Sequence, residues 1–264
     1  MKKLIAFLLV LVMMLGIVAC APAEQEKNDS KPVESEPDDS QKEPTAMTYA
    51  EYVAADLDTQ VVVEFYVQAT QGWWFNDDPE VNSGLITIYG QSAEGGYFSY
   101  ETKCDEETGK KLVPGTKIRV TGDKKIWDGE VEIMNGTLEV LEGDTWIAES
   151  LDVTALMGTA ELEDHMNKKV AVKGATVEAA NEAGDVFLYK WNGAGSEGDD
   201  LYFNVSVGGQ TYTFVVESYL CGLGSDTYEA VRGLQVGDVI DLEGFLYWYN
   251  GAQPHITSVV KAAE

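Results

Sequence analysis

The stretch LVPGTKIRVTGDKKIWDG, residues 112–129, occurs a second time as LQVGDVIDLEGFLYWYNG, residues 234–251. The copies align without a gap and share leucine at the first position and glycine at the fourth, eleventh and eighteenth. Each copy reads as a glycine turn followed by a strand with alternating apolar residues. The strand ends at Asp128-Gly129 or Asn250-Gly251, which are dipeptides that favour tight type I′ turns. The repeat predicts two copies of one β-rich domain.

Residues on either side of the first copy extend this pattern. Apolar residues that alternate, or that are β-formers, predict strands over 61–67, 85–89 and 97–100, and residues 131–141 supply the last strand or two. Thr48 is a candidate N-cap for a short opening helix. The polar segment 104–111, which precedes the repeat, is expected to be a loop.

The same order recurs around the second copy. Strands are expected near 170–177, 201–207 and 210–216, with a hairpin at Gly208-Gly209. A capping box from Asp226 to Glu229 opens a short helix that Gly233 ends. A helix between the third and fourth of five strands is the plan of the OB-fold. The predicted fold class is therefore all-β with short helices: two five-stranded Greek-key OB-fold barrels in tandem.

This arrangement resembles the tandem OB-fold domains of uncharacterised bacterial surface lipoproteins, and those that accompany the catalytic domains of bacterial surface nucleases. The resemblance covers about residues 47–264. It is carried by Gly95-Gly96-Tyr97-Phe98 with Tyr100, the repeat 112–122, Trp127-Asp128-Gly129, Tyr249-Asn250-Gly251 and Pro254-His255-Ile256. It implies the fold. Nuclease activity does not carry over, because the sequence has no nuclease catalytic domain.

The first 19 residues resemble a bacterial lipoprotein signal peptide. Lys2 and Lys3 precede an apolar run over 4–18, and the run leads into Ile17-Val18-Ala19-Cys20. In that family the cysteine becomes the first residue of the mature protein and carries a palmitate-containing lipid, so the resemblance implies lipid attachment at Cys20. The alternative is a transmembrane anchor, but about fifteen apolar residues fall short of the roughly twenty that a span requires. We expect the protein to be exported to the cell envelope. There its lipid anchors it to the membrane and it is displayed at the cell surface.

Composition then sets the domain boundaries. Residues 20–46 hold eight acidic residues, three lysines and four of the seven prolines, with almost no large apolar side chain. Such a segment cannot form a core and is expected to be an acidic, disordered tether. The folded domains are expected over 47–148 and 149–264.

The chain is strongly acidic, and the tether is not the main cause. The formal net charge is −27; residues 1–19 contribute +2 and residues 20–46 contribute −5, so residues 47–264 retain −24. A field of this sign repels phosphate backbones and anionic headgroups. Nucleic acid is therefore expected to be an unlikely partner, although plain solubility explains the acidity equally simply.

Catalytic motifs are scarce. The sequence has only two histidines, His165 and His255, and no phosphate loop, Gly-x-Ser-x-Gly elbow or Cys-x-x-Cys. We expect a protein that is not an enzyme and needs no cofactor. Cys104 and Cys221 occupy similar places in different units, so both are expected to be unpaired.

The acidic residues that follow Trp73-Trp74-Phe75 are the one weak candidate for a metal site. Asp77, Asp78 and Glu80 are candidate ligands for Ca²⁺, and a metal-dependent hydrolase is the enzymatic alternative. A solvated acidic loop explains these residues more simply. The same holds for Glu197 and for Asp199-Asp200.

Aromatic residues give the candidate binding site. OB-folds bind oligosaccharides or single-stranded nucleic acid on the face of strands two and three, where rings stack on flat ligands. The candidates are Trp73, Trp74, Tyr97, Trp127, Tyr189 and Trp191. The acidity favours carbohydrate, so we predict non-catalytic binding of an extracellular ligand. The alternative is a structural or assembly protein that binds another protein at the envelope.

A second aromatic stripe competes with this interpretation. Phe245, Tyr247 and Tyr249 lie opposite the apolar face of their own strand. Two apolar faces need two partners, so these residues are candidates for an interface with the first domain, another protein or a ligand.

Overall fold

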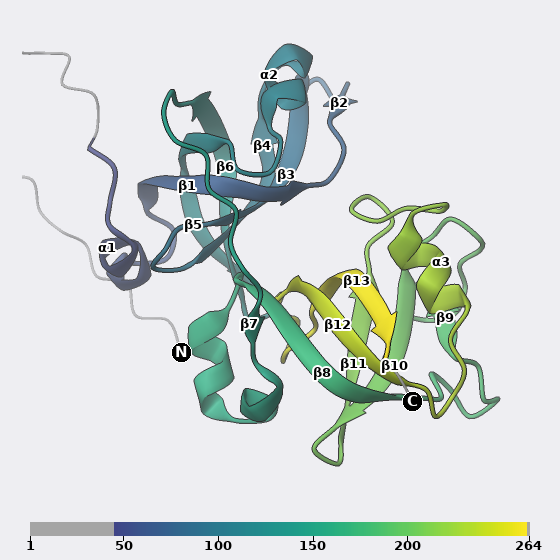
Figure 1. Ribbon diagram of the computed structural model, residues 1–264. Coiled ribbons are helices and arrows are strands. Elements are labelled where there is room, and N and C mark those ends of the chain that lie inside the picture. The colour runs from purple at the N-terminus through teal and green to yellow at the C-terminus, as the bar shows by residue number, and fades with distance from the viewer. Residues whose placement is uncertain (1–44, 263–264) are drawn as a thin grey trace, which may run out of the picture. The chain divides into compact units, whose positions relative to one another are not determined.

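The computed structural model of the protein describes residues 45–262 (Figure 1). Cys20 and nearly all of the tether lie outside the described residues, and the predictions for them stay predictions. One compact unit runs from Pro44 to Glu264 and contains both barrels. No helix within residues 45–262 is long and apolar enough to cross a membrane.

The first barrel is a closed sheet with strand order β1-β5-β6-β4-β3, in which β1 also pairs with β3. Its strands are β1 (Gln60–Thr70), β3 (Ser83–Gln91), β4 (Gly96–Lys103), β5 (Lys117–Trp127) and β6 (Glu130–Val140). A short strand, β2 (Trp74–Asn76), adds to β3 at the edge. All neighbours are antiparallel except β4 and β6, which are parallel. This is the predicted five-stranded Greek-key topology.

Alternation along β1 builds the core of this barrel. Val61, Val63, Phe65 and Val67 are all fully buried, because successive residues of a strand point to opposite faces. The ring of Phe65 stacks on Tyr97, with 4.9 Å between ring centroids. These contacts form the interior of the first barrel.

The second barrel repeats the plan with strand order β8-β12-β13-β11-β10, closed by pairing of β8 with β10. Its strands are β8 (Lys169–Glu178), β10 (Leu201–Val207), β11 (Gln210–Val216), β12 (Val239–Phe245) and β13 (His255–Lys261). Two short strands, β7 (Leu151–Asp152) and β9 (Phe187–Tyr189), extend the sheet. The parallel pair is here β11 with β13. The prediction of an all-β tandem of OB-folds is confirmed.

The repeated stretch begins with the same turn in both barrels, but its strand differs in length. Strand β5 continues to Trp127, whereas β12 ends at Phe245 and not at Asn250-Gly251 as the sequence predicts. Gly115 and Gly237 precede β5 and β12 with φ values of +92° and +94°, which a residue with a side chain adopts only with strain. Asp128 and Gly129 have φ values of +47° and +98°, as a type I′ turn requires. Gly115, Gly129 and Gly237 therefore mark turns, as the sequence indicates, whereas Gly122 and Gly244 lie inside β5 and β12.

Three α-helices and two short 3₁₀ segments complete the fold. The helices are α1 (Tyr49–Ala54), α2 (Glu106–Lys111) and α3 (Asp226–Arg232), and the 3₁₀ segments are η1 (Thr154–Leu156) and η2 (Ala160–His165). Helix α1 has the predicted N-cap, Thr48, in a full capping box with Glu51. Helix α3 is also as predicted, except that its N-cap is Ser225, one residue before Asp226.

Helix α2 corrects the prediction of a loop over 104–111. Asp105 caps it by accepting a hydrogen bond from the Thr108 amide at 2.7 Å. Two ion pairs at i,i+4 spacing, Glu106–Lys110 at 2.7 Å and Glu107–Lys111 at 3.0 Å, add modest local support. Capping and charge pairing thus offset the low helix propensity of the glycine at position 109, so both barrels have a helix before the repeated strand.

Candidate functional site: an aromatic cleft between the barrels

Aromatic rings of the two barrels meet in one small cluster. Tyr89 of β3 stacks on Phe245 of β12 with 4.6 Å between ring centroids. Phe98 of β4 meets Tyr247 edge-on at 5.3 Å. Two of the three interface candidates, Phe245 and Tyr247, therefore contact the first barrel. The third, Tyr249, is about half exposed and lies outside this cluster.

A buried histidine joins the rings by hydrogen bonding. The Tyr89 hydroxyl lies 2.8 Å from Nδ1 of His255, and the ring of Tyr247 stacks on the imidazole at 4.1 Å. Gln71 donates to the Tyr89 oxygen at 3.3 Å, which leaves the Tyr89 proton free for Nδ1. Burial lowers the pKa of His255 to about 3, so the ring is neutral at neutral pH.

A second set of contacts ties the β5–β6 hairpin to the segment after β12. The Trp248 amide donates to Oε2 of Glu130 at 2.8 Å, and the Asn250 amide donates to the Asp128 carbonyl at 2.6 Å. Glu130 is fully buried, and its other oxygen, Oε1, has no hydrogen-bond partner. Burial raises the pKa of Glu130 to about 8, so the side chain is mostly a neutral acid at neutral pH.

A cleft with a volume of about 690 Å³ opens beside these contacts. Its lining residues are Gln71, Gly72, Trp74, Thr87, Phe98, Tyr100, Glu101, Trp127, Glu132, Met134, Glu217, Tyr219, Tyr247 and His255. Both barrels contribute to it. Three of these side chains are carboxylates, and none of the described residues that line the cleft is Lys or Arg. The cleft thus combines rings with acidic groups.

Four rings present exposed area at the cleft. Trp74 and Tyr100 are partly exposed, Trp127 is 60% exposed and Tyr219 is 77% exposed. The first three come from β2, β4 and the end of β5, while Tyr219 follows β11 in the second barrel. Large rings that stay exposed beside a cleft can stack on a flat ligand without disturbing either core.

The structure brings only two of the six candidate binding residues to this cleft, Trp74 and Trp127. Tyr97 is a correction: it is 2% exposed and stacks on Phe65 inside the first barrel. Trp73 is a correction too, because it packs against the same core and its indole Nε1 donates to the Cys104 carbonyl at 3.1 Å. Neither side chain lines the cleft.

The remaining candidates lie in the second barrel and do not duplicate the site. Tyr189 pairs with Leu201 at the barrel edge and packs against the second core. Trp191 is 73% exposed in the following loop but does not line the cleft. The cleft is therefore asymmetric, and most of its lining residues come from the first barrel.

Sequence reasoning missed two buried acids of β6, of which Glu132 lines the cleft and Glu130 does not. Glu130 and Glu132 alternate along β6 and are both buried, at 0% and 5% exposure. Two acids at alternate positions of one strand share a face. That spacing was the available signal, although it becomes informative only when the other barrel covers the face. Glu217 and Tyr219 carry no comparable pattern.

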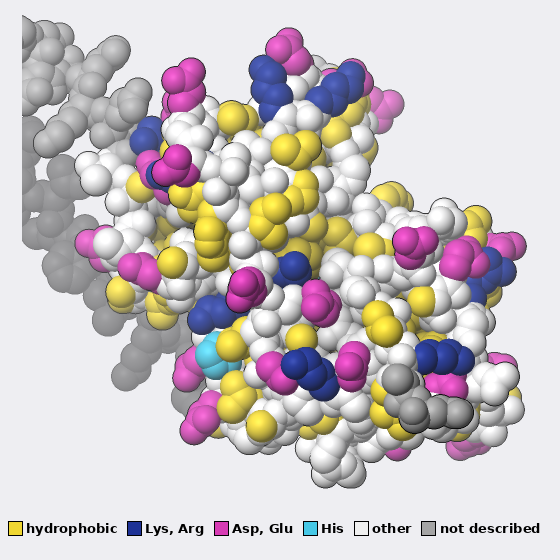
Figure 2. Space-filling model, viewed as in Figure 1, with side chains coloured by type: hydrophobic (Ala, Val, Ile, Leu, Met, Phe, Trp, Pro, Cys, Tyr) yellow, Lys and Arg dark blue, Asp and Glu magenta, His cyan; other side chains and the backbone are white. Residues whose placement is uncertain are grey.

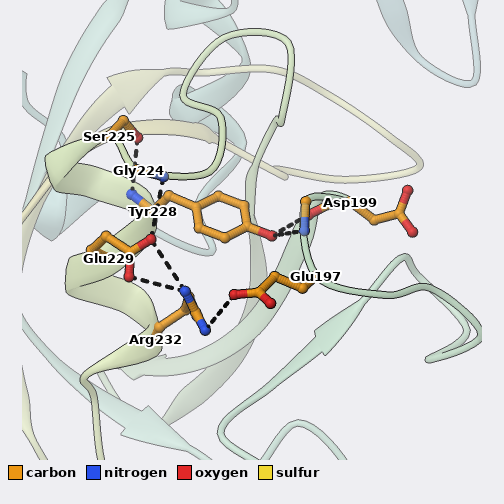
Figure 3. Close-up of polar contacts among 8 residues, drawn as sticks. Glu197, Asp199, Gly224, Ser225, Tyr228, Glu229 and Arg232 are labelled. Atoms are coloured by element: carbon orange, nitrogen blue, oxygen red, sulfur yellow. Dashed lines mark hydrogen bonds and ion pairs between the residues drawn. The ribbon is translucent and has the colours of Figure 1, made fainter.

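The acidic loops have internal partners. Arg232 of α3 pairs with Glu197 at 2.7 Å, and the Tyr228 hydroxyl donates to the Asp199 carbonyl at 2.8 Å (Figure 3). Helix α3 therefore holds the glycine-rich loop, residues 192–200. Asp200 accepts from the amide and hydroxyl of Ser218. These contacts give the loop's acids a structural role.

The weak calcium candidates lie between β2 and β3. Within that loop Asp78 accepts a hydrogen bond from the Glu80 amide at 2.9 Å, and Asp77 lies beside it in the chain. No group of three or more His, Cys, Asp or Glu suited to a metal ion occurs within residues 45–262. Cys104 and Cys221 are free thiols whose pKa values burial raises, which makes them poor nucleophiles.

Charge on the surface is dispersed. On the face shown in Figure 2, acidic side chains are spread over the molecule with Lys and Arg among them, and hydrophobic side chains gather over the first barrel. On this face the acidic side chains do not by themselves define a binding site.

No protein-family model matches the chain, and no curated protein matches it. Solved structures with a distant likeness do. A murine DNA-binding protein bound to double-stranded DNA has a TM-score of 0.36 and 12% identity, covering 76% of this chain and 99% of its own. The Ifi202 HINa domain in complex with double-stranded DNA has a TM-score of 0.32 and 12% identity, covering 76% and 94%. A replication protein A heterotrimer bound to single-stranded DNA has a TM-score of 0.32 and 11% identity, covering 78% and 49%.

These comparisons contradict the predicted order of partners. The sequence interpretation placed carbohydrate, or a protein at the envelope, ahead of nucleic acid and called nucleic acid unlikely. The three solved structures named above are instead bound to DNA. The physical error was to let the net charge decide: charge opposes phosphate contacts, whereas stacking of a base on a ring does not depend on it.

Proposed function

We propose that the cleft binds a planar nitrogen heterocycle of the nucleobase class. The observation that carries this proposal is the gathering of four exposed rings, Trp74, Tyr100, Trp127 and Tyr219, around one cleft. Each base stacked on an aromatic side chain gains about 1–3 kcal/mol, and every nucleobase has the flat face that such stacking needs. Rings from both barrels can sandwich the ligand.

The size of the cleft suits this class of ligand. Its volume of about 690 Å³ falls within the range of about 300–1,000 Å³ that is usual for small-molecule sites. A single nucleoside leaves part of such a volume unfilled, so a second ring can stack beside the first. A free nucleoside and the bases of a single strand present the same chemistry to these rings.

Electrostatics decides how a single strand would bind. With −24 on residues 47–264 and no Lys or Arg among the described cleft residues, the phosphates are held outside and the contact is made through bases. Salt screens the repulsion between protein and phosphate. The affinity for an oligonucleotide should therefore rise with salt, opposite to the fall that phosphate-contacting proteins show.

The test is a titration followed by tryptophan fluorescence, with adenosine in one arm and a single-stranded oligoadenylate in the other. Trp127→Ala should weaken binding of adenosine about tenfold or more, from the stacking energy it removes. The matched control is Trp191→Ala, which removes an equally exposed indole that lies outside the cleft.

The two arms separate the sources of the ligand. Saturable adenosine binding with no gain from the strand identifies a nucleoside site, whereas tighter oligoadenylate binding that strengthens with salt identifies a strand site. Absence of binding in both arms would overturn the proposal. So would a Trp191→Ala variant that loses binding while Trp127→Ala retains it.

We propose further that the site is displayed outside the cytoplasm on a lipid carried by Cys20, and that the protein binds its ligand without transforming it. The resemblance of residues 1–20 to a lipoprotein signal supports the first point. Labelled palmitate should be incorporated into the wild-type protein and not into Cys20→Ser. Adenosine or oligoadenylate recovered unchanged after incubation would support the second point, and any chemical product would refute it.

A further inference from the structure

One of the acidic side chains that line the cleft has no hydrogen-bond or ion-pair partner among the described residues. Glu132 is 5% exposed and lines the cleft from β6. Burial alone raises its pKa to about 7, with neither a hydrogen bond nor an opposite charge within residues 45–262 to offset that rise. A buried acceptor in this condition lacks the donor that buried polar groups normally have. Helix caps, ion pairs and turns account for many of the other acids, but they do not account for Glu132.

The second barrel contributes a comparable group. Glu217 also lines the cleft, and its Oε1 lies 3.8 Å from Nε2 of His255, which is too long for a hydrogen bond. Since His255 is neutral, it supplies no countercharge. Burial and then the nearby charge of Asp200 raise the pKa of Glu217 to about 7. Two carboxyl groups from different barrels therefore face the cleft and lack a donor.

We infer that Glu132 and Glu217 read an exocyclic amino group on the ligand, so that the cleft selects amino-bearing heterocycles, such as cytosine and adenine, over rings with a carbonyl at that position, such as uracil. This inference rests on the proposed function and specifies which nucleobases the site takes. An amino group donates to a carboxylate, as in contacts of Glu or Asp with N4 of cytosine. A carbonyl at the same position places two acceptors face to face and leaves both unpaired.

The protonation state of Glu132 and Glu217 changes which heterocycles the cleft prefers. An amino group favours the ionised carboxyl, while a carbonyl favours the protonated one, which can donate. Cytidine binding should therefore strengthen as pH rises from 6 to 8, and uridine binding should weaken. The titratable groups around the pair from the surrounding elements are Glu101, Glu130, Asp200, His255 and the tyrosines at positions 100 and 247. Burial raises the tyrosine pKa values, so both tyrosines stay neutral over this range.

Cytidine and uridine make a matched pair, because they share the ribose and the pyrimidine ring. Cytidine carries the amino group and an unprotonated N3, whereas uridine carries a carbonyl and an N3–H. Isothermal titration at pH 6 and pH 8 should give a preference for cytidine on the order of tenfold at pH 8 and a smaller one at pH 6. Glu132→Gln, which presents an amide with no charge to titrate, should reduce both the preference and its pH dependence. Glu217→Gln serves as the second variant, and the exposed Glu142→Gln is the control.

The outcomes separate this inference from the proposed function. If both nucleosides bind equally at both pH values and Trp127→Ala weakens both, the stacking site stands and the amino-group selection is overturned. If neither nucleoside nor adenosine binds, the proposed function itself fails. Retention of the full preference in both Glu132→Gln and Glu217→Gln, with unchanged circular dichroism, would also overturn the inference.

Discussion

Replacing Glu130 with glutamine is expected to stabilise the protein at neutral pH and to change little at pH 4.5. The native side chain is fully buried, accepts a hydrogen bond from the Trp248 amide and has one oxygen without a partner. Glutamine keeps an acceptor of the same size for that amide. It also removes the need to hold a proton on a buried acid.

The direction of this pH dependence of stability follows from proton binding. The pKa of Glu130 lies at about 8 in the folded protein against an ordinary value of 4.5. Between these two values the folded state binds more protons than the unfolded state, so the free energy of unfolding falls as pH rises. The stabilising contribution of the neutral acid is complete below pH 4.5 and is lost as pH rises through about 8.

The magnitude follows from the same two values. At about 1.4 kcal/mol per pH unit, the span from 4.5 to 7 corresponds to a loss on the order of 3 kcal/mol at pH 7. Glu130→Gln does not suffer this loss. Since Glu132 and Glu217 titrate in the same direction in both proteins, the difference between wild type and variant isolates Glu130.

Urea unfolding followed by tryptophan fluorescence, at several pH values from 4.5 to 8, measures this difference. The variant should gain over wild type steadily as pH rises. Parallel stability curves would refute the reasoning, because they would mean that Glu130 binds protons equally in the folded and unfolded states. A variant that is less stable than wild type at pH 8 would show that the unpartnered oxygen is not a burden.

Three further substitutions test the packing, each by the same urea titration. Gly129→Ala should destabilise by about 1–3 kcal/mol, because φ is +98° and a Cβ would lie 2.7 Å from Cδ1 of Trp248; unchanged stability would mean that this turn relaxes freely. Lys124→Met should cost about 2–3 kcal/mol, since its buried ammonium donates to three backbone carbonyls at 2.8–3.0 Å; no loss would show that these carbonyls find other donors. Tyr89→Phe should cost about 1 kcal/mol through the lost bond to His255, and an increase in stability would contradict that bond.

Local signals in the sequence were enough for the fold. The glycines at positions 115, 129 and 237 specify turns that the chain must make. Alternation along residues such as Val61 and Val63 fixes which face of the strand is buried. Thr48 and the box from Asp226 to Glu229 mark helix starts within one residue. Helix α2 was not predicted, because its glycine and polar residues are typical of a loop. Its cap and its ion pairs stabilise it only once it has formed.

The cleft could be predicted only in part because it forms between barrels. Trp74 and Trp127 were chosen as aromatics of the ligand-binding face and loops of an OB-fold, and they do line it. Tyr97 was chosen on the same grounds, but tertiary packing places it inside the first barrel. Glu132 and Tyr219 become neighbours of the cleft only when the barrels meet, so no local pattern identifies them. Net charge, a property of the whole chain, gave the wrong order of partners.

The most direct measurement of the central claim is the set of tryptophan indole N–H signals in a proton–nitrogen correlation spectrum, recorded with and without adenosine. Each of the six tryptophans gives one signal. A ligand stacked in the cleft should shift the signals of Trp74 and Trp127 and leave that of Trp191 unchanged. A spectrum in which no indole signal moves at saturating adenosine, or in which only Trp191 responds, would contradict a stacking site between the barrels.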